Sequence, residues 1–137
     1  MFKAKDIMTK EVITVREETP ICEAIKLLAE KNITGLPVIT DDKRLVGIIT
    51  EKDMMKLMYD PDIEYCHVGD LMTTAVVSFD ENDNLQDVCM ELMENNFRRV
   101  PILSKGKLVG IISRSDIIKF ILLKTVKHAR TKSEFDH

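Results

Sequence analysis

Two heptapeptides in the chain pair a hydroxyl group with a carboxylate at the same spacing. GIITEKD (47–53) ends an apolar run at Thr50 and places Asp53 three residues later, and GIISRSD (110–116) does the same with Ser113 and Asp116. This spacing is typical of a capping box, in which both side chains bind backbone N–H groups at a helix start. The same corner suits a nucleotide, because its N–H groups and hydroxyl can bind phosphate and its carboxylate can accept bonds from a ribose diol. Spacing alone leaves both interpretations open.

Two adjacent arginines, Arg98 and Arg99, precede the apolar run VPILS (100–104). The planar guanidinium group matches the oxygens of a phosphate better than any other side chain. The alternative is that both are solvated surface residues, which is the commoner state of arginine. The pair therefore indicates a candidate phosphate contact that needs a structure to place it.

Other chemistries find little support in the sequence. The cysteines lie far apart without a C-x-x-C pair, and the histidines have no ligand spacing, so we expect reduced thiols, no disulfide framework and no metal site. No histidine lies close in sequence to either hydroxyl group, so we expect a binding protein without catalytic residues and not an enzyme. The residues concerned are Cys22, Cys66, Cys89, His67, His128 and His137.

The chain is an internal duplication. DIMTKEVITVREETP (6–20) matches DLMTTAVVSFDENDN (70–84) at an offset of 64 residues, which holds as far as Pro37 and Pro101. LVGIIT (45–50) then matches LVGIIS (108–113) at an offset of 63. This ordered run of matches predicts two repeats of about 55 residues. The first repeat has the uncharged Thr34-Gly35 where the second has the two arginines.

Each repeat reads as strand, helix, strand, strand and helix. The first strands are VITV (12–15) and VVSF (76–79), and Thr19 and Asp83 are the expected caps of the helices that follow. LPVIT and VPILS form hairpins with LVGII, and a last helix begins near Thr50 or Ser113. We expect a parallel, right-handed crossover before each hairpin.

The predicted fold class is α/β, with two pseudo-symmetric β-α-β-β-α repeats that pack through their sheets and helices. A small sheet with helices on one face leaves apolar surface uncovered, and a second repeat can cover it. The predicted boundaries are 1–59 for the first repeat, 60–69 for a linker, 70–122 for the second repeat, and 123–137 for a helix extension and tail.

The end of the chain continues as an apolar helix face formed by Ile117, Ile118, Ile121 and Leu122. We expect this face to be buried against the other repeat or against a second subunit of a two-fold dimer. The basic stretch LLKTVKHARTK extends the helix, and residues 132–137 are expected to fray.

Composition is ordinary for a soluble globular protein of 137 residues, with 45% hydrophobic and 31% charged residues. The net charge of −3, with interspersed signs, speaks against a nucleic-acid surface. Lys3, Lys5 and Asp6 interrupt any signal peptide, and Lys119 and Lys124 interrupt the longest apolar stretch. We therefore expect no membrane contact and a cytoplasmic location.

The combination of D-[IL]-M-T, the G-L-P or R-V-P second strand and G-I-I-[TS]-x-x-D resembles a tandem pair of cystathionine-β-synthase (CBS) domains, or Bateman module. The resemblance covers residues 6–121 in both copies. It implies a stand-alone regulatory module that senses energy state by binding AMP, ADP, ATP or sometimes S-adenosylmethionine in clefts between the repeats. It implies no required cofactor, a disc-shaped homodimer and a separate regulated protein that the sequence does not name. The alternative is a scaffold that dimerises or docks on a partner without any ligand.

The resemblance also implies roles for particular residues. Asp53 and Asp116 would bind ribose, Thr50 and Ser113 would approach phosphate, and the segment before one repeat would complete the cleft of the other. One cleft would combine Thr9, Val12, Ile13, Ile111, Ser113 and Asp116; the second would combine Thr73, Val76, Val77, Ile48, Thr50 and Asp53. For each apolar member, core packing is the alternative.

Arg98 and Arg99 would reach phosphate, and Thr34 holds the matching place in the first repeat. Because only the second repeat carries the arginines, we hypothesise that the cleft with Asp116, Ser113 and Arg99 is the stronger nucleotide site. The cleft with Thr50 and Asp53 would then be weaker or select a less charged ligand.

Overall fold

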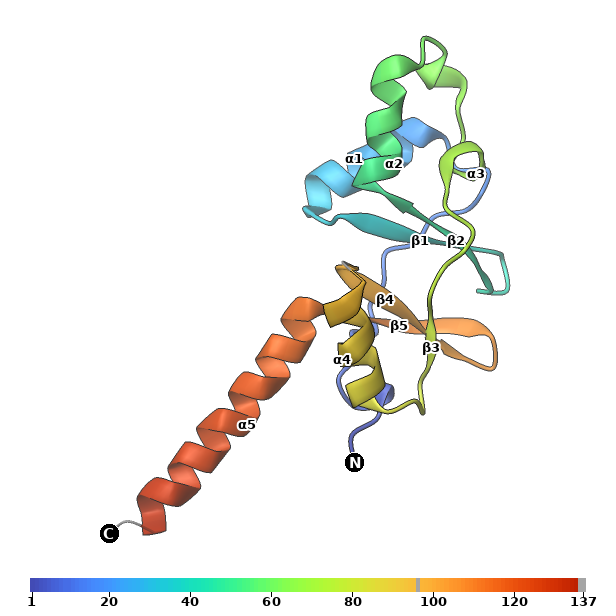
Figure 1. Cartoon of the computed structure of the whole chain (residues 1–137). Helices are drawn as coiled ribbons and strands as arrows, with labels where there is room; N and C mark the ends of the chain where they lie inside the picture. Colours follow the sequence, from blue (N-terminus) through green and yellow to red (C-terminus); the bar gives the residue numbers. More distant parts are fainter. Residues whose placement is uncertain (96, 136–137) are drawn as a thin grey trace.

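The computed structural model describes the backbone of residues 1–95 and 97–135, with side chains as far as residue 126. It consists of two halves that lie one above the other, each built around a small sheet with helices beside it (Figure 1). The predicted α/β fold of two pseudo-symmetric repeats is confirmed. Asn96, which precedes the Phe97-Arg98-Arg99 stretch, lies outside the described residues.

In sequence order, a short 3₁₀ turn that packs in the second half precedes the helix–hairpin–helix unit of the first half. The elements are η1 (Ala4–Asp6), α1 (Ile21–Lys31), β1 (Gly35–Ile39), β2 (Leu45–Thr50), α2 (Glu51–Met55), η2 (Lys56–Tyr59) and η3 (Ile63–Tyr65). The second repeat follows the same order, with a short helix before it that packs in the first half, and it ends in a long helix. Its elements are α3 (Val68–Leu71), β3 (Phe79–Asp80), α4 (Leu85–Glu94), β4 (Arg99–Ser104), β5 (Lys107–Ser113) and α5 (Arg114–Phe135).

The two hairpins have matching registers. β1 pairs antiparallel with β2 so that Gly35 lies opposite Thr50, and β4 pairs antiparallel with β5 so that Arg99 lies opposite Ser113. In the second half, β3 adds in parallel to β4 and gives the order β3-β4-β5. The parallel pairing followed by a hairpin is the arrangement that the second repeat predicts.

The first predicted strand of each repeat is much shorter than expected. Of residues 12–15, only Val15 bridges to the sheet, in parallel with Val38, and of residues 76–79 only Phe79 belongs to a strand. The reason is that the preceding residues pair with the other half: Thr9 bridges to Ile111. The segment pairs at Thr9 with the sheet of the second half and reaches the sheet of the first half only at Val15. Tertiary pairing therefore overrides β-propensity.

The expected helix caps are also wrong. α1 has Pro20 and α4 has Asn84 at the N-cap, and neither makes a side-chain cap bond. The Thr19 hydroxyl instead accepts from the N–H of Arg16 at 2.9 Å, and the Asp83 carboxylate accepts from the N–H of Asp80 at 2.8 Å. Both side chains close the turn before the helix, a local bond that competes with capping.

The core of the second half includes a residue from the very start of the chain. Ala4 is completely buried among residues of the second half, and its N–H donates to the carbonyl of Asp83 at 2.9 Å. Further along, Thr9 exchanges two backbone hydrogen bonds with Ile111, at 2.8 and 2.9 Å. The segment before the first repeat therefore completes the second half. Its core consists of Ala4, Leu85, Val88, Leu92, Val100, Ile102, Ile112 and Ile117.

The core of the first half is completed in the same way from residues 68–73. Val68 is completely buried there, and its N–H donates to the carbonyl of Thr19 at 2.9 Å. Thr73 exchanges two backbone hydrogen bonds with Ile48, both at 2.9 Å. The halves are thus joined by crossed segments, and the domain boundaries drawn from the sequence stay predictions. This core consists of Val15, Ile21, Ala24, Leu28, Leu36, Val38, Ile49, Leu57 and Val68.

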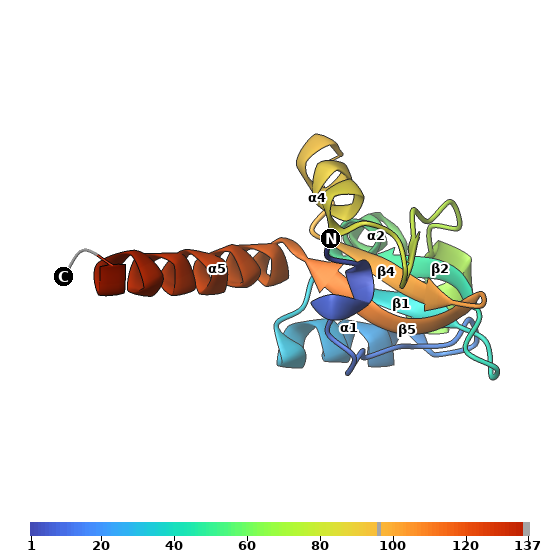
Figure 2. The same cartoon turned by 90° about the horizontal axis from the view of Figure 1, so that it is seen from below.

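Helix α5 extends away from the two sheets as a single rod in both views (Figures 1 and 2). Ile117 is buried in the second core, but Ile118, Ile121 and Leu122 are 64%, 50% and 60% exposed. These three residues are therefore not buried against the other repeat, and burial by a second subunit stays a prediction. The backbone is helical through Phe135, and the fraying expected for residues 132–137 stays a prediction; residues 136–137 lie outside the described part. Within the described chain, none of the helices combines the length and the apolar character that crossing a bilayer requires.

Candidate functional site

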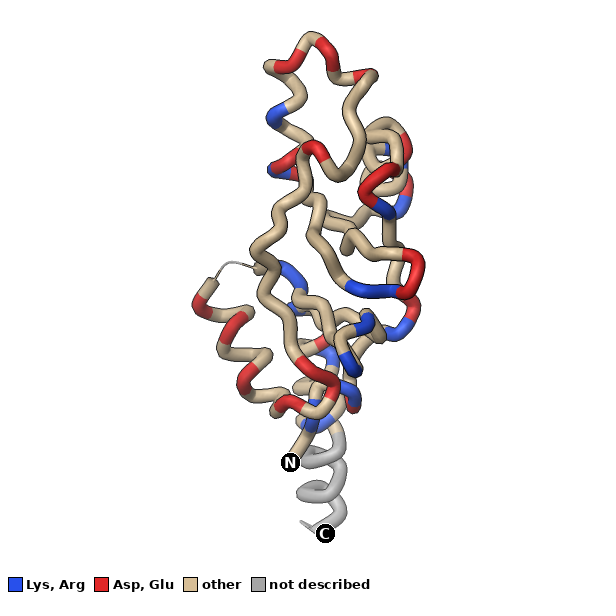
Figure 3. The backbone as a smooth tube through the Cα atoms, turned by 90° about the vertical axis from the view of Figure 1, so that its right-hand side faces the viewer, with Lys and Arg blue, Asp and Glu red and all other residues tan. Residues whose placement is uncertain are grey.

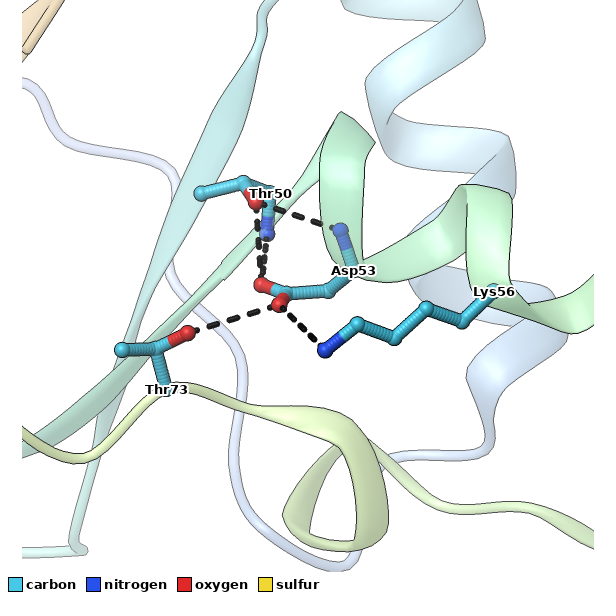
Figure 4. Close-up of polar contacts among 4 residues, drawn as sticks. All are labelled: Thr50, Asp53, Lys56 and Thr73. Carbon is cyan, nitrogen blue, oxygen red and sulfur yellow. Dashed lines mark hydrogen bonds and ion pairs between the residues drawn. The ribbon is translucent and has the colours of Figure 1, made fainter. Parts of the chain in front are cut away.

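The corner between β2 and α2 is held by Thr50 and Asp53 (Figure 4). The Asp53 carboxylate accepts from the N–H and the hydroxyl of Thr50, both at 2.9 Å, and the N–H of Asp53 donates to the Thr50 hydroxyl at 3.3 Å. The other carboxylate oxygen accepts from the Thr73 hydroxyl at 3.4 Å and lies 3.9 Å from Lys56 Nζ. Asp53 is only 4% exposed. The pair is a complete capping box.

The corner between β5 and α5 repeats this geometry. The Asp116 carboxylate accepts from the N–H and the hydroxyl of Ser113 at 2.8 and 3.0 Å, and the N–H of Asp116 donates back to the hydroxyl at 3.2 Å. Its second oxygen accepts from the Thr9 hydroxyl at 3.3 Å. Each aspartate is thus bonded to a threonine of the segment that crosses over from the other repeat.

Capping does not exhaust the hydrogen-bonding capacity of these carboxylates. A carboxylate has about four acceptor sites. The Oδ2 atoms are used by the caps, whereas Oδ1 of Asp116 accepts one long bond from a hydroxyl group that can rotate. Asp116, which is half-buried, therefore retains acceptor capacity toward a diol. The same geometry is therefore compatible with both interpretations of the sequence, a helix-capping box and a nucleotide-binding corner.

A first cavity, the Asp116 cleft, has a volume of about 250 Å³ and opens beside the β5–α5 corner. All six residues predicted for this cleft line it: Thr9, Val12, Ile13, Ile111, Ser113 and Asp116. Arg99 lines it as well. The sequence did not indicate Glu11, Ile33, Gly35, Pro37 and Ser115, which also line it. Glu11 and Ser115 could have been found as neighbours of predicted residues.

A second cavity, the Thr50 cleft, is larger, about 570 Å³, and lies beside the β2–α2 corner. Of the predicted set, Thr34, Ile48, Thr50, Thr73, Val76, Val77, Arg98 and Arg99 line it. Asp53 is not among its described lining residues, because its carboxylate is enclosed by Thr50 and Thr73. Residues that the sequence did not indicate are Gly35, Glu51, Lys52, Met55, Ala75, Asn95, Phe97 and Pro101.

Arg99 lines both clefts, whereas Arg98 lines only the Thr50 cleft. The Nε atom of Arg99 is buried and has no hydrogen-bond partner among the described residues. Burial lowers the pKa of Arg99 below the usual value for arginine, while the charge of Asp116 partly offsets this effect. The guanidinium stays charged at neutral pH, so a half-buried cation lines both cavities.

The charges of the two clefts differ. Lys52, Arg98 and Arg99 outnumber Glu51 around the Thr50 cleft, whereas Arg99 faces Glu11 and Asp116 in the Asp116 cleft. In Figure 3 a basic stretch marks the start of β4, which follows the acidic residues of α4 along the chain. The Thr50 cleft is therefore the more cationic of the two. In the described part of the chain, no three His, Cys, Asp or Glu residues are grouped as a metal site requires.

Two crossed repeats with a cleft beside each strand-to-helix corner define a tandem-repeat architecture. The family described as CBS domain matches residues 4–60 and again residues 68–123. The chain belongs to the CBS domain family and contains two copies of the domain.

Comparison with known proteins agrees with this assignment. The chain is 37% identical over 117 residues, 85% of its length, to the uncharacterized protein MJ1225 of Methanocaldococcus jannaschii. The solved structure of CBSX2 from Arabidopsis thaliana in complex with AMP superposes with a TM-score of 0.82 at 33% identity, covering 91% of this chain and 99% of that one. The CBS domain pair of protein MJ0100, in complex with 5′-methylthioadenosine and S-adenosyl-L-methionine, gives a TM-score of 0.77 at 30% identity, covering 90% and 98%.

The chain spans only part of several relatives. It covers 42% of the length of MJ1225, and 65% and 64% of the chloroplastic Arabidopsis proteins CBSX1 and CBSX2. The shared part is the pair of CBS domains.

Proposed function

We propose that this chain is a regulatory module that binds adenosine ligands in its inter-repeat clefts and transmits their presence to a separate protein in the cytoplasm. The candidate ligands are AMP, ADP, ATP and S-adenosylmethionine, and no catalytic residue or required cofactor is part of the proposal. The observation that carries it is the pairing of a hydroxyl–aspartate corner with Arg99 at each cleft. Solved family members in complex with AMP and with S-adenosyl-L-methionine support the same ligand class.

The Thr50 cleft is the better candidate for a ligand with more than one phosphate. Its volume of about 570 Å³ lies within the range of roughly 300–1,000 Å³ usual for ligand pockets, whereas 250 Å³ lies just below it. Its three basic residues also suit phosphate. This placement reverses the order of affinity that the arginine pattern alone predicts, because Arg98 faces the Thr50 cleft.

Thermal unfolding with each candidate ligand tests the proposal. A ligand that binds only the folded chain stabilises it by about 2.7 kcal/mol at 100 times its Kd. We expect a higher Tm with at least one adenine nucleotide. The same concentration of ribose 5-phosphate should leave the Tm unchanged. Unchanged Tm values with AMP, ADP, ATP and S-adenosylmethionine would contradict ligand binding.

The two aspartates separate the clefts in a calorimetric titration. We expect Asp116→Ala to weaken binding in the Asp116 cleft, where its carboxylate lines the cavity. Asp53→Ala should act on the Thr50 cleft through the position of Thr50 and Thr73, to which Asp53 is bonded. Equal loss in both clefts from either variant would contradict separate sites.

A second candidate function is a scaffold that works without a ligand. A cavity of about 470 Å³ between α4 and α5 supports it, together with exposed apolar residues such as Met93 and Ile121. This face is also where a second copy would pack in the homodimer that the family resemblance implies. Sedimentation at several concentrations checks this, and Ile121→Glu should shift the chain toward the monomer while Lys107→Gln should not. The cavity is lined by Cys89, Leu92, Met93, Arg114, Ile117, Ile118 and Ile121.

A further inference from the structure

One side chain, Arg99, belongs to both candidate clefts. It enters β4 opposite Ser113, at the point where the two halves meet, and it lines the Asp116 cleft and the Thr50 cleft alike. Among the charged lining residues of the two cavities, Arg99 is the one that they share. Gly35, the other shared residue, has no side chain to offer.

The Asp116 cleft depends on this one cation. Around that cavity the other charged residues, Glu11 and Asp116, are acidic, so a phosphate there has Arg99 as its cationic partner. The Thr50 cleft has Arg98 and Lys52 in addition. A phosphate in the Thr50 cleft can therefore draw on Arg99 and still be held without it, whereas a phosphate in the Asp116 cleft cannot.

The local environment favours engagement of Arg99 by one ligand at a time. Its Nε donor is buried and unpartnered among the described residues, so the side chain can turn toward an anion without breaking an Nε hydrogen bond. The guanidinium is a rigid fork whose donors lie in one plane, so turning it toward one oxygen set turns it away from another. Two phosphates on either side of it would also repel one another across a partly buried region, where screening is weak.

We propose that Arg99 couples the two clefts negatively, so that a phosphate-bearing ligand bound in one cleft weakens the binding of a second phosphate-bearing ligand in the other. This inference rests on the proposed function, since it takes both clefts to be nucleotide sites. The coupling makes the module respond over a wider range of ligand concentration than two independent sites do. A neutral ligand in one cleft leaves the other unaffected.

Methyl NMR reads the two clefts separately, because Ile111 lines the Asp116 cleft and Ile48 lines the Thr50 cleft. The probe is AMP or ATP, whichever raises the Tm more. In the wild-type chain, the methyl signal of one cleft should saturate first. The signal of the other cleft should respond only at higher ligand concentration, because occupancy of the first cleft raises the Kd of the second. We expect a coupling factor of about tenfold, within the range of about 5–150-fold usual for linked sites.

Two variants that fill one cleft with a neutral side chain measure that factor. Ala75→Trp fills the Thr50 cleft and Val12→Trp fills the Asp116 cleft; neither residue lines the other cavity. Filling the cleft that binds first should tighten nucleotide binding in the remaining one by about tenfold relative to its Kd in the unchanged chain. An unchanged Kd there means independent sites and overturns the proposal.

Arg99→Gln provides a test that does not need the tryptophan variants to fold. It should raise the nucleotide Kd in both clefts and remove the coupling between them. Arg98→Gln is the matched control, because it removes the same charge from the Thr50 cleft alone and should raise the Kd only at Ile48. If Arg99→Gln raises the nucleotide Kd in only one cleft, Arg99 does not serve both clefts and the proposal is overturned.

Adenosine, which lacks phosphate, separates this proposal from the proposed function. With adenosine, occupancy of one cleft should leave the Kd of the other within about twofold, since only charge and the guanidinium carry the coupling. Coupling that is as large with adenosine as with the nucleotide overturns the role of Arg99. The absence of any methyl shift with either the nucleotide or adenosine overturns the proposed function itself, whereas independent binding in both clefts overturns only the coupling.

Discussion

Gly47 and Gly110 lie directly against the methionines of the crossed segments. A Cβ atom added at Gly47 would lie 2.7 Å from the sulfur of Met72 and 2.9 Å from the backbone oxygen of Thr73. At Gly110 it would lie 2.6 Å from the sulfur of Met8, with no backbone atom among its nearest contacts. The glycine of each heptapeptide and the methionine of D-[IL]-M-T are therefore parts of one contact, which explains why the two motifs occur together in each repeat.

The difference between these contacts predicts unequal effects of alanine. Gly47→Ala meets a backbone oxygen that cannot move aside, so we expect it to lower the free energy of unfolding by about 1–3 kcal/mol. Gly110→Ala meets only a flexible side chain and should cost less, and Met8→Ala in the same chain should recover part of the loss. Urea denaturation measures both. A larger cost at Gly110 would contradict this contact geometry.

The two capping aspartates should stabilise the chain even without a ligand. Asp53→Ala and Asp116→Ala each leave one backbone N–H group, that of Thr50 or Ser113, without its carboxylate partner, and we expect each to cost about 0.5–2 kcal/mol in urea denaturation. Lys52→Ala, an exposed neighbour, serves as the control and should change the free energy of unfolding by less than about 0.5 kcal/mol. Stability unchanged by both aspartate variants would mean that the carboxylates serve the ligand alone.

At the scale of elements, the sequence predicts the duplicated strand-to-helix corners better than the backbone pairing between the two halves. The corners at Thr50 and Ser113 follow from local spacing, and the structure has both. The first strands do not follow from local propensity, because the chain before Val15 pairs with the other half. The sequence also does not predict which cleft each arginine side chain lines, because successive residues near a strand face opposite ways. Arg98 therefore reaches one cleft alone, whereas Arg99 reaches both.

Helix α5 carries two adjacent isoleucines with opposite environments, which gives a test at the level of the element. Ile117 is 7% exposed in the second core, and Ile118 is 64% exposed. We expect Ile117→Ala to cost about 2–5 kcal/mol and Ile118→Ala less than about 0.5 kcal/mol in the monomer. If a second copy covers the face, the cost of Ile118→Ala should grow with protein concentration in urea denaturation. A cost at Ile118 equal to that at Ile117 at low concentration would contradict the exposed position.

At the scale of the whole molecule, the crossed segments make each half depend on residues that precede the other. Ala4 is completely buried in the second core and Val68 in the first. A ligand that binds between the halves touches both, because Thr9 and Ile111 of one cleft, like Thr73 and Ile48 of the other, belong to paired segments. A ligand bound in either cleft would therefore contact the paired segments that connect the two repeats, and not one repeat alone.

This crossing predicts that core substitutions act on the distant half. Val68→Ala should cost roughly 1–3 kcal/mol by removing buried methyl groups, and Ala4→Leu should cost about 1–3 kcal/mol by overpacking. In native-state hydrogen exchange, Val68→Ala should lower protection in 21–50, and Ala4→Leu in 85–113, because local opening follows the core that each residue supports. Met90→Ala, at an exposed position of α4, is a control that should leave both regions unchanged. Loss of protection near residue 4 or 68 alone, with both hairpins unaffected, would show that the crossed segments add little to the halves on which they pack.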